Sequence, residues 1–104
     1  MAPDASIEPT RAEVDGTAGA LVLEFGAGWC PICRAARPLI DRALAANPNA
    51  RHLWIEDGKG KPLGRSFRVK LWPTLVFLRD GREVARLVRP TTPAEISAAL
   101  QAIS

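Results

Sequence analysis

Hydrophobic positions recur along the chain with two different spacings, and these spacings predict where strands and helices lie. Residues 20–26 form an apolar run of strand length, interrupted by the charged residue Glu24. A run without polar alternation is typical of a strand covered on both faces of a parallel sheet. Residues 52–56 predict a second strand, and a short edge strand is expected around Ser6 and Ile7.

A hairpin is the clearest local signal in the chain. Residues 74–78 read Thr-Leu-Val-Phe-Leu, a composition typical of a strand, and residues 83–88 return as its antiparallel partner. Between them lies Asp80-Gly81. An Asp-Gly pair favours a two-residue turn, because both turn positions require a backbone conformation that these residue types tolerate.

Apolar residues spaced three and four apart predict the helices. The longest is expected over residues 31–46 and ends at Asn47-Pro48-Asn49. Pro38 lies inside this pattern and removes one helical hydrogen bond, so we expect one kinked helix instead of two separate ones.

Three shorter helices are indicated by their first residues. Thr10 with Glu13, and Thr92 with Glu95, have the spacing of capping boxes, in which two side chains satisfy free N–H groups at a helix start. A proline is favoured at the first position of a helix. These signals predict helices over residues 11–15 and 93–103, and one from Pro62 to about Arg68.

The order of these elements predicts an α/β fold. Strands separated by helices, followed by an antiparallel hairpin, imply one mixed sheet with helices on both faces. The chain has 104 residues, of which 47% are hydrophobic and 24% charged. That length suffices for one hydrophobic core, so residues 1–104 are expected to form a single domain.

The net charge of +3 comes from eleven arginines and three lysines that are spread along the chain. Their dispersion, without an interleaved aromatic and basic platform, argues against nucleic-acid binding. One stretch is enriched in cations and is expected to favour acidic partners by electrostatic steering. Its residues are Lys59, Lys61, Arg65, Arg68 and Lys70.

Location is predicted from what the sequence lacks. The apolar runs are far shorter than the roughly 20 residues of a membrane span. Residues 1–8 carry neither the basic nor the apolar segment of a secretory signal. We therefore expect a cytoplasmic protein that does not associate with membranes, and an export signal that has been removed stays open as an alternative. A monomer is also expected.

The two cysteines lie three residues apart at a predicted strand-to-helix junction. With Pro31 at the first helical position, Cys30 becomes the N-cap, next to free N–H groups and the positive end of the helix dipole. That exposed position favours the reactive thiolate form. Cys33 follows one turn later on the same helix face, close enough for a disulfide. The spacing indicates a switch between dithiol and disulfide.

With these motifs the chain resembles the thioredoxin family over about residues 21–100. Trp29-Cys30-Pro31-Ile32-Cys33 follows an apolar strand bearing one acid, Glu24, and Pro38 lies in the helix behind it. Trp72-Pro73-Thr74 opens the hairpin. The resemblance implies a thioredoxin-like three-layer sandwich and a thiol–disulfide oxidoreductase that reduces protein disulfides without a cofactor. A reductase or a low-molecular-weight thiol would supply its electrons.

The resemblance also implies roles for individual residues. Cys30 would be the nucleophile, and Cys33 would resolve the mixed disulfide. Glu24 would relay a proton to or from Cys33, as a buried acid or base. Pro73 would be a cis proline facing the dithiol, and the backbone of Trp72 would pair with an extended substrate strand. The other expected substrate contacts are Trp29, Pro31, Ile32 and Arg89.

Several positions depart from the family pattern. Pro31-Ile32 replaces the usual Gly-Pro pair, which leaves the preferred direction of electron flow open. Gly26 stands where a tryptophan is common, Arg89 where a glycine is usual, and Trp72 where a smaller apolar residue is usual. A disulfide oxidase or isomerase, a glutathione-linked oxidoreductase and a non-catalytic interaction module therefore stay open as alternatives.

Other interpretations concern the remaining polar and aromatic residues. A zinc site is not expected, because His52 is the only further candidate ligand and zinc prefers four. His52 itself is interpreted as a surface residue without an acidic neighbour. Trp54 is interpreted as core packing, and Trp29 as a surface residue beside the motif.

Overall fold

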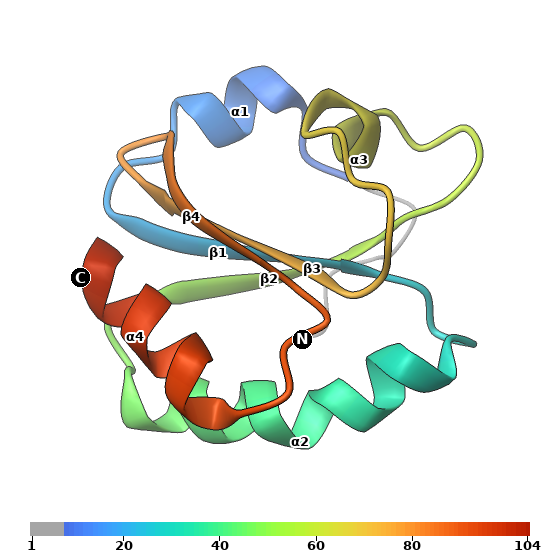
Figure 1. Ribbon diagram of the computed structural model, residues 1–104. Coiled ribbons are helices and arrows are strands. Elements are labelled where there is room, and N and C mark those ends of the chain that lie inside the picture. The colour runs from blue at the N-terminus through green and yellow to red at the C-terminus, as the bar shows by residue number, and fades with distance from the viewer. Residues whose placement is uncertain (1–7) are drawn as a thin grey trace.

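A four-stranded mixed sheet forms the centre of the computed structural model, which describes residues 8–104 (Figure 1). The edge strand expected around Ser6 and Ile7 lies outside the described residues. The spatial order of the strands is β2-β1-β3-β4. Their bounds are Ala20–Gly26 for β1, Arg51–Glu56 for β2, Thr74–Arg79 for β3 and Arg82–Val88 for β4.

Strand directions agree with the sequence-based prediction. β1 and β2 are parallel, whereas β3 is antiparallel to both β1 and β4. The turn between β3 and β4 has positive φ angles of 51° at Asp80 and 80° at Gly81. These are the angles that a two-residue turn of type I′ requires, so the predicted hairpin is confirmed.

Helices cover both faces of the sheet. In Figure 1, α1 and α3 lie on one side, and α2 and α4 lie on the other. The predicted three-layer α/β sandwich is therefore confirmed. Within residues 8–104 no helix is both long and apolar enough to cross a membrane. The helix bounds are Arg11–Asp15 for α1, Pro31–Ala46 for α2, Pro62–Ser66 for α3 and Pro93–Ile103 for α4.

Helix ends follow the local signals. Thr10 and Thr92 each cap a helix and complete a capping box with the glutamate three residues later. α2 continues through Pro38 as one helix of 16 residues, as expected. α3 ends at Ser66, two residues earlier than predicted.

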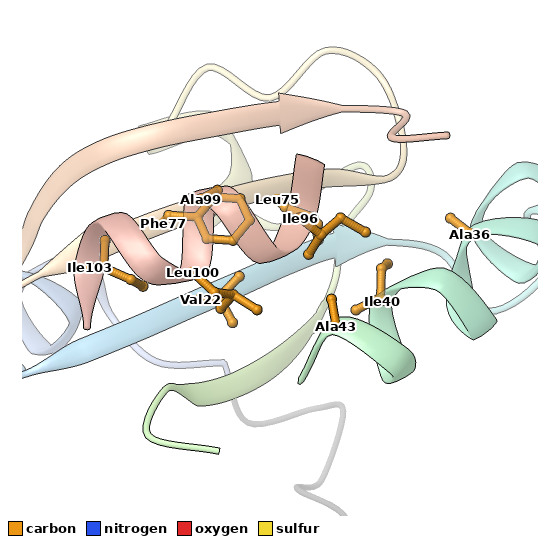
Figure 2. Close-up of a cluster of buried hydrophobic side chains, with 10 residues drawn as sticks. All are labelled: Val22, Ala36, Ile40, Ala43, Leu75, Phe77, Ile96, Ala99, Leu100 and Ile103. Atoms are coloured by element: carbon orange, nitrogen blue, oxygen red, sulfur yellow. The ribbon is translucent and has the colours of Figure 1, made fainter. Parts of the chain in front are cut away.

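Alternate residues of β1 face opposite layers, and this alternation decides what lies next to Glu24. Leu21, Leu23 and Phe25 join the cluster beneath α1 and α3. Val22 belongs to the cluster that α2 and α4 cover, which Figure 2 shows. Because Glu24 is two residues beyond Val22, its side chain points to the same face, toward α2.

Candidate redox site

Cys30 is the N-cap residue of α2, at the point where the chain leaves β1 and starts the helix. Its backbone is extended, with φ −78° and ψ 117°, and Pro31 follows at the first helical position. The backbone N–H of Cys33 donates a hydrogen bond of 3.3 Å to the Cys30 sulfur. The thiol thus takes the place that a serine or aspartate oxygen usually has at an N-cap.

The pKa of Cys30 is lowered from its ordinary value. Burial opposes ionisation, but hydrogen bonds from the Cys33 thiol and from the N–H groups of Cys33 and Ile32 outweigh it. The positive charge of Arg89 lowers the pKa further. A thiolate at Cys30 is therefore stabilised by donors already present in the helix start.

The opposite holds for Cys33, although it lies only one turn away. Burial, its hydrogen bond to Cys30 and the negative charge of Glu24 raise the pKa of Cys33 to about 11. Its thiol stays protonated near neutral pH. The pair is therefore asymmetric, with one sulfur ready to attack and one held in reserve.

Cys30 is less accessible than the sequence indicated. Its exposed fraction is 6%, against 4% for Cys33, so the expectation of an exposed Cys30 is wrong. The Trp72 side chain packs against the cysteines. Trp29 meets Trp72 edge-on, with ring centroids 5.7 Å apart, and is 69% exposed. Trp29 is thus a surface residue, as interpreted.

The Trp72–Pro73 peptide bond is cis, as the resemblance implied. Next to it, the side chain of Arg89 donates a hydrogen bond of 2.9 Å from Nε to the carbonyl oxygen of Trp72. The Arg89 N–H donates to the carbonyl of Pro73, at 2.9 Å. Arg89 has a positive φ of 52°, which is costly for a residue with a side chain. An arginine therefore occupies a backbone conformation suited to glycine. Its side chain contacts the Trp72 carbonyl, part of the backbone that is expected to pair with substrate.

Glu24 is fully buried with an exposed fraction of 0%. Its Oε1 lies 2.7 Å from Nε2 of His52, and its Oε2 lies 3.5 Å from a guanidinium nitrogen of Arg37. Within the described residues Oε2 has no hydrogen-bond partner. A buried carboxyl group beside Cys33 and only partly satisfied is unusual in a core.

The interpretation of His52 as a surface residue without an acidic neighbour is wrong. Its side chain is 22% exposed and bonded to Glu24. Parallel pairing of β1 with β2 places His52 opposite Val22, on the same face as Glu24. The alternation of side chains along each strand predicts that each residue faces the α2 side. The contact between them also requires knowledge of how β1 and β2 pair, because the two residues are 28 positions apart in the chain.

Trp54 is half-buried, and it belongs to the surroundings of the dithiol more than to either main core cluster. Its ring lies 5.0 Å below the Arg37 guanidinium. A Cβ atom on Gly26 would approach the Trp54 ring to 2.8 Å and the Cys33 sulfur to 2.9 Å. The glycine therefore leaves room for Trp54, and the core interpretation of this tryptophan is wrong.

The structure brings most of the predicted site residues together. Trp72 packs against the cluster that holds Cys30 and Cys33, Trp29 lies against Trp72, and Arg89 reaches the Trp72 carbonyl. The cis Pro73 follows Trp72 directly and is buried. Pro31 and Ile32 are exposed in the first turn of α2. Glu24 lies in the layer beneath them. A pocket of about 400 Å³, lined by Cys33, Arg34, Arg37 and Trp54 among others, opens on the β2 side.

A comparison with protein families identifies this arrangement. The thioredoxin family model matches residues 8–102, so the chain belongs to the thioredoxin family. Among solved structures, it is similar to reduced thioredoxin 2 from Pseudomonas aeruginosa PAO1. The two share 51% sequence identity with a TM-score of 0.82, over 92% of this chain and 89% of that one.

Curated relatives give more distant matches. Thioredoxin H-type 1 of Nicotiana tabacum is 32% identical over 68 residues, which are 65% of this chain and 54% of that protein. Thioredoxin of Chlamydia pneumoniae is 31% identical over 70 residues, which are 67% of this chain and 69% of that protein. The chain thus spans little more than half the length of the tobacco relative.

Proposed function

We propose that this protein is a thiol–disulfide oxidoreductase that reduces disulfide bonds in other proteins. The observation that carries the proposal is the asymmetry of the dithiol, in which the pKa of Cys30 is lowered and that of Cys33 is raised to about 11. One sulfur can begin the reaction, and the other can finish it. The family relationship supports the same activity.

The reaction proceeds in two exchanges. The Cys30 thiolate attacks one sulfur of the partner disulfide, the partner's S–S bond breaks, and its other sulfur leaves and takes up a proton. Cys33 then loses its proton and attacks the Cys30 sulfur. The mixed disulfide breaks, the partner leaves as a dithiol, and the protein keeps the Cys30–Cys33 disulfide. Two electrons have passed to the partner, and a reductase or a low-molecular-weight thiol restores the dithiol.

Glu24 and His52 supply the base for the second exchange. The Cys33 thiol needs one, because a group with a pKa of about 11 seldom ionises at neutral pH. Glu24 is near enough for its charge to raise the pKa of that thiol. Its hydrogen bond to the partly exposed His52 ring connects the buried carboxyl group to solvent. The proton therefore leaves Cys33 through Glu24 and then His52.

Substrate binds over the surface formed by Trp29, Pro31, Ile32, Trp72 and Arg89, and the buried cis Pro73 shapes the backbone at Trp72. The carbonyl of Trp72 already accepts a hydrogen bond from Arg89. An extended substrate strand that pairs with that carbonyl must share the oxygen with the Arg89 side chain or displace it. Arg89 thus restricts which partners bind by backbone pairing.

Trapping tests this function directly. Cys33→Ser should attack a protein disulfide and stop at a mixed disulfide, which is visible as a higher-mass band on a non-reducing gel and disappears with dithiothreitol. Cys30→Ser should form no such band and should show no turnover. A non-catalytic interaction module predicts instead that both variants behave alike, so equal bands would overturn the proposal.

The reduction potential decides the direction of electron flow. A reductase should have a reduction potential close to that of thioredoxin, about −270 mV. A potential close to that of a strong disulfide oxidant, about −120 mV, would favour the oxidase alternative. The predicted cytoplasmic location is consistent with a reductase, because thiols in the cytosol are kept reduced. Both the location and the monomeric state stay predictions.

A further inference from the structure

Five cationic side chains line one open hollow beside the redox site. The hollow has a volume of about 540 Å³ and lies between the loop that precedes α3, the helix itself and the segment that leads to β3. All but one of these side chains are exposed, and the fifth is half-exposed. They are Lys59, Lys61, Arg65, Arg68 and Lys70.

The hollow has a net positive charge because, among the described residues that line it, five cations face one carboxylate, Asp57. Asp57 Oδ2 accepts a hydrogen bond of 2.8 Å from the Trp72 indole. Within residues 8–104 none of the five cations forms an ion pair. The cations outnumber the carboxylate and repel each other, so the arrangement favours an anionic occupant.

Trp72 joins the hollow to the dithiol. Trp72 lines the hollow and also packs against the cluster formed by Ala27, Cys30 and Cys33. Arg89, which donates a hydrogen bond to the Trp72 carbonyl, adds a further positive charge that acts on Cys30. A segment bound in the hollow therefore lies one side chain away from the reacting sulfurs.

We propose that this hollow binds an acidic segment of the disulfide-bearing partner, next to the cysteine that Cys30 attacks. The inference rests on the proposed function, since the same partner must present its disulfide to Cys30. A volume of this size is about 10 Å across, which an extended chain crosses in about three residues. Its open shape and separate cations suit several carboxylates along a peptide better than one small anion.

Matched peptides test this inference. Two synthetic disulfide peptides are compared, with three glutamates or three glutamines next to the reactive cysteine. The protein should reduce the glutamate peptide with a kcat/KM about tenfold higher at low salt, equivalent to about 1.4 kcal/mol. The preference should fall toward unity as ionic strength rises, because salt screens exposed charges.

Charge reversal locates the effect. The double variant Arg65→Glu and Arg68→Glu should lose the preference and keep the rate on the glutamine peptide. The control reverses two exposed arginines elsewhere, Arg42→Glu and Arg51→Glu, with the same change in net charge. It should keep most of the preference. Equal losses in both variants would assign the effect to net charge and overturn the inference.

Three further outcomes separate the hypotheses. If the wild type reduces both peptides equally at low salt, the hollow does not select acidic partners and the inference fails, although the proposed function stands. If neither peptide nor the uncharged 2-hydroxyethyl disulfide is reduced, the proposed function fails. If a labelled single-stranded DNA binds the wild type more tightly than the glutamate peptide, and the Arg65/Arg68 variant loses that binding, the hollow is a nucleic-acid site instead.

Discussion

Cys30, the N-cap of α2, and Cys33 in its first turn are three residues apart, yet their thiols differ in pKa. The difference comes from position, because Cys30 receives hydrogen bonds from the free N–H groups of the helix start. Cys33 lies deeper, with the negative charge of Glu24 nearby. Neighbouring groups, and not the residue type, therefore assign the two roles.

Alkylation should separate the two thiols. With a pKa of about 11, only about one Cys33 thiol in 10,000 is ionised at pH 7. Iodoacetamide should therefore modify Cys30 alone near neutrality. The rate should rise with pH through a midpoint below the ordinary pKa of a cysteine, and Arg89→Gln should raise that midpoint because it removes a positive charge. Mass spectrometry of the modified protein gives the site and the rate, and preferential modification of Cys33 at pH 7 would contradict this assignment.

Glu24→Gln tests the proposed proton path from Cys33, and its two expected effects oppose each other. Removing the negative charge lowers the pKa of Cys33, which alone would speed its attack. Removing the base should slow the same step, and we expect the base to dominate by about tenfold or more. Stopped-flow measurement of partner release should show this loss, while formation of the mixed disulfide keeps its rate. Faster release in Glu24→Gln would exclude Glu24 as the base.

His52 is tested in the same assay. His52→Gln can still donate a hydrogen bond to Glu24 but cannot carry a proton to solvent. We expect slower partner release in His52→Gln, with an altered pH dependence and little change in stability. Wild-type release rates in this variant would limit His52 to holding the Glu24 side chain in place.

At the scale of elements, the turn between β3 and β4 lies against the end of α1. Gly81 has a φ of 80°, and a Cβ atom there would overlap the backbone carbonyl of Asp15. Gly60 has nearly the same φ, 81°, but open space around it. The two glycines therefore share a backbone conformation and differ in surroundings.

This pair separates conformational from steric cost. Gly60→Ala should lower the free energy of unfolding by about 1–2 kcal/mol, the cost of a left-handed conformation for a residue with a Cβ. Gly81→Ala should cost about 1–3 kcal/mol more, because the hairpin must move away from α1. Urea denaturation measures both values. Equal costs for the two variants would show that the turn can move away from α1 without a further loss of stability.

Elements defined by neighbouring residues were predictable from sequence. The hairpin at Asp80-Gly81 and the helix starts at Thr10 and Thr92 depend on residues within a few positions, so their patterns were sufficient. The bond between Glu24 and His52 was missed because it depends on the pairing of two strands. Cys30 belongs to a buried cluster against which Trp72 packs, and Trp72 comes from a distant part of the chain, so the local sequence did not indicate this packing.

At the scale of the whole molecule, two core clusters share the same strands. β1 sends Val22 to the cluster under α2 and α4, and Leu21 to the cluster under α1 and α3. β3 does the same with Phe77 and Leu78. Neither face can lose its packing without loosening strands that the other face needs, so the domain should unfold as one unit.

Truncating one buried leucine on each face tests this coupling. Leu100→Ala in α4 and Leu63→Ala in α3 should each lower the free energy of unfolding by about 2–5 kcal/mol. Val84→Ala, at an exposed position of β4, is the control and should cost much less. Far-ultraviolet circular dichroism then follows the sheet and helices, while fluorescence follows the three tryptophans.

The two signals report on different parts of the molecule. Trp29 and Trp72 lie beside Cys30, and Trp54 lines the pocket next to Cys33. Coincident midpoints in every variant would show that the redox site loses its structure only when the whole sheet does. If Leu63→Ala shifts the circular dichroism and leaves the fluorescence transition in place, the two faces unfold separately. In that case α2, β1 and β2 alone would hold the dithiol, and the shared strands would not couple the layers.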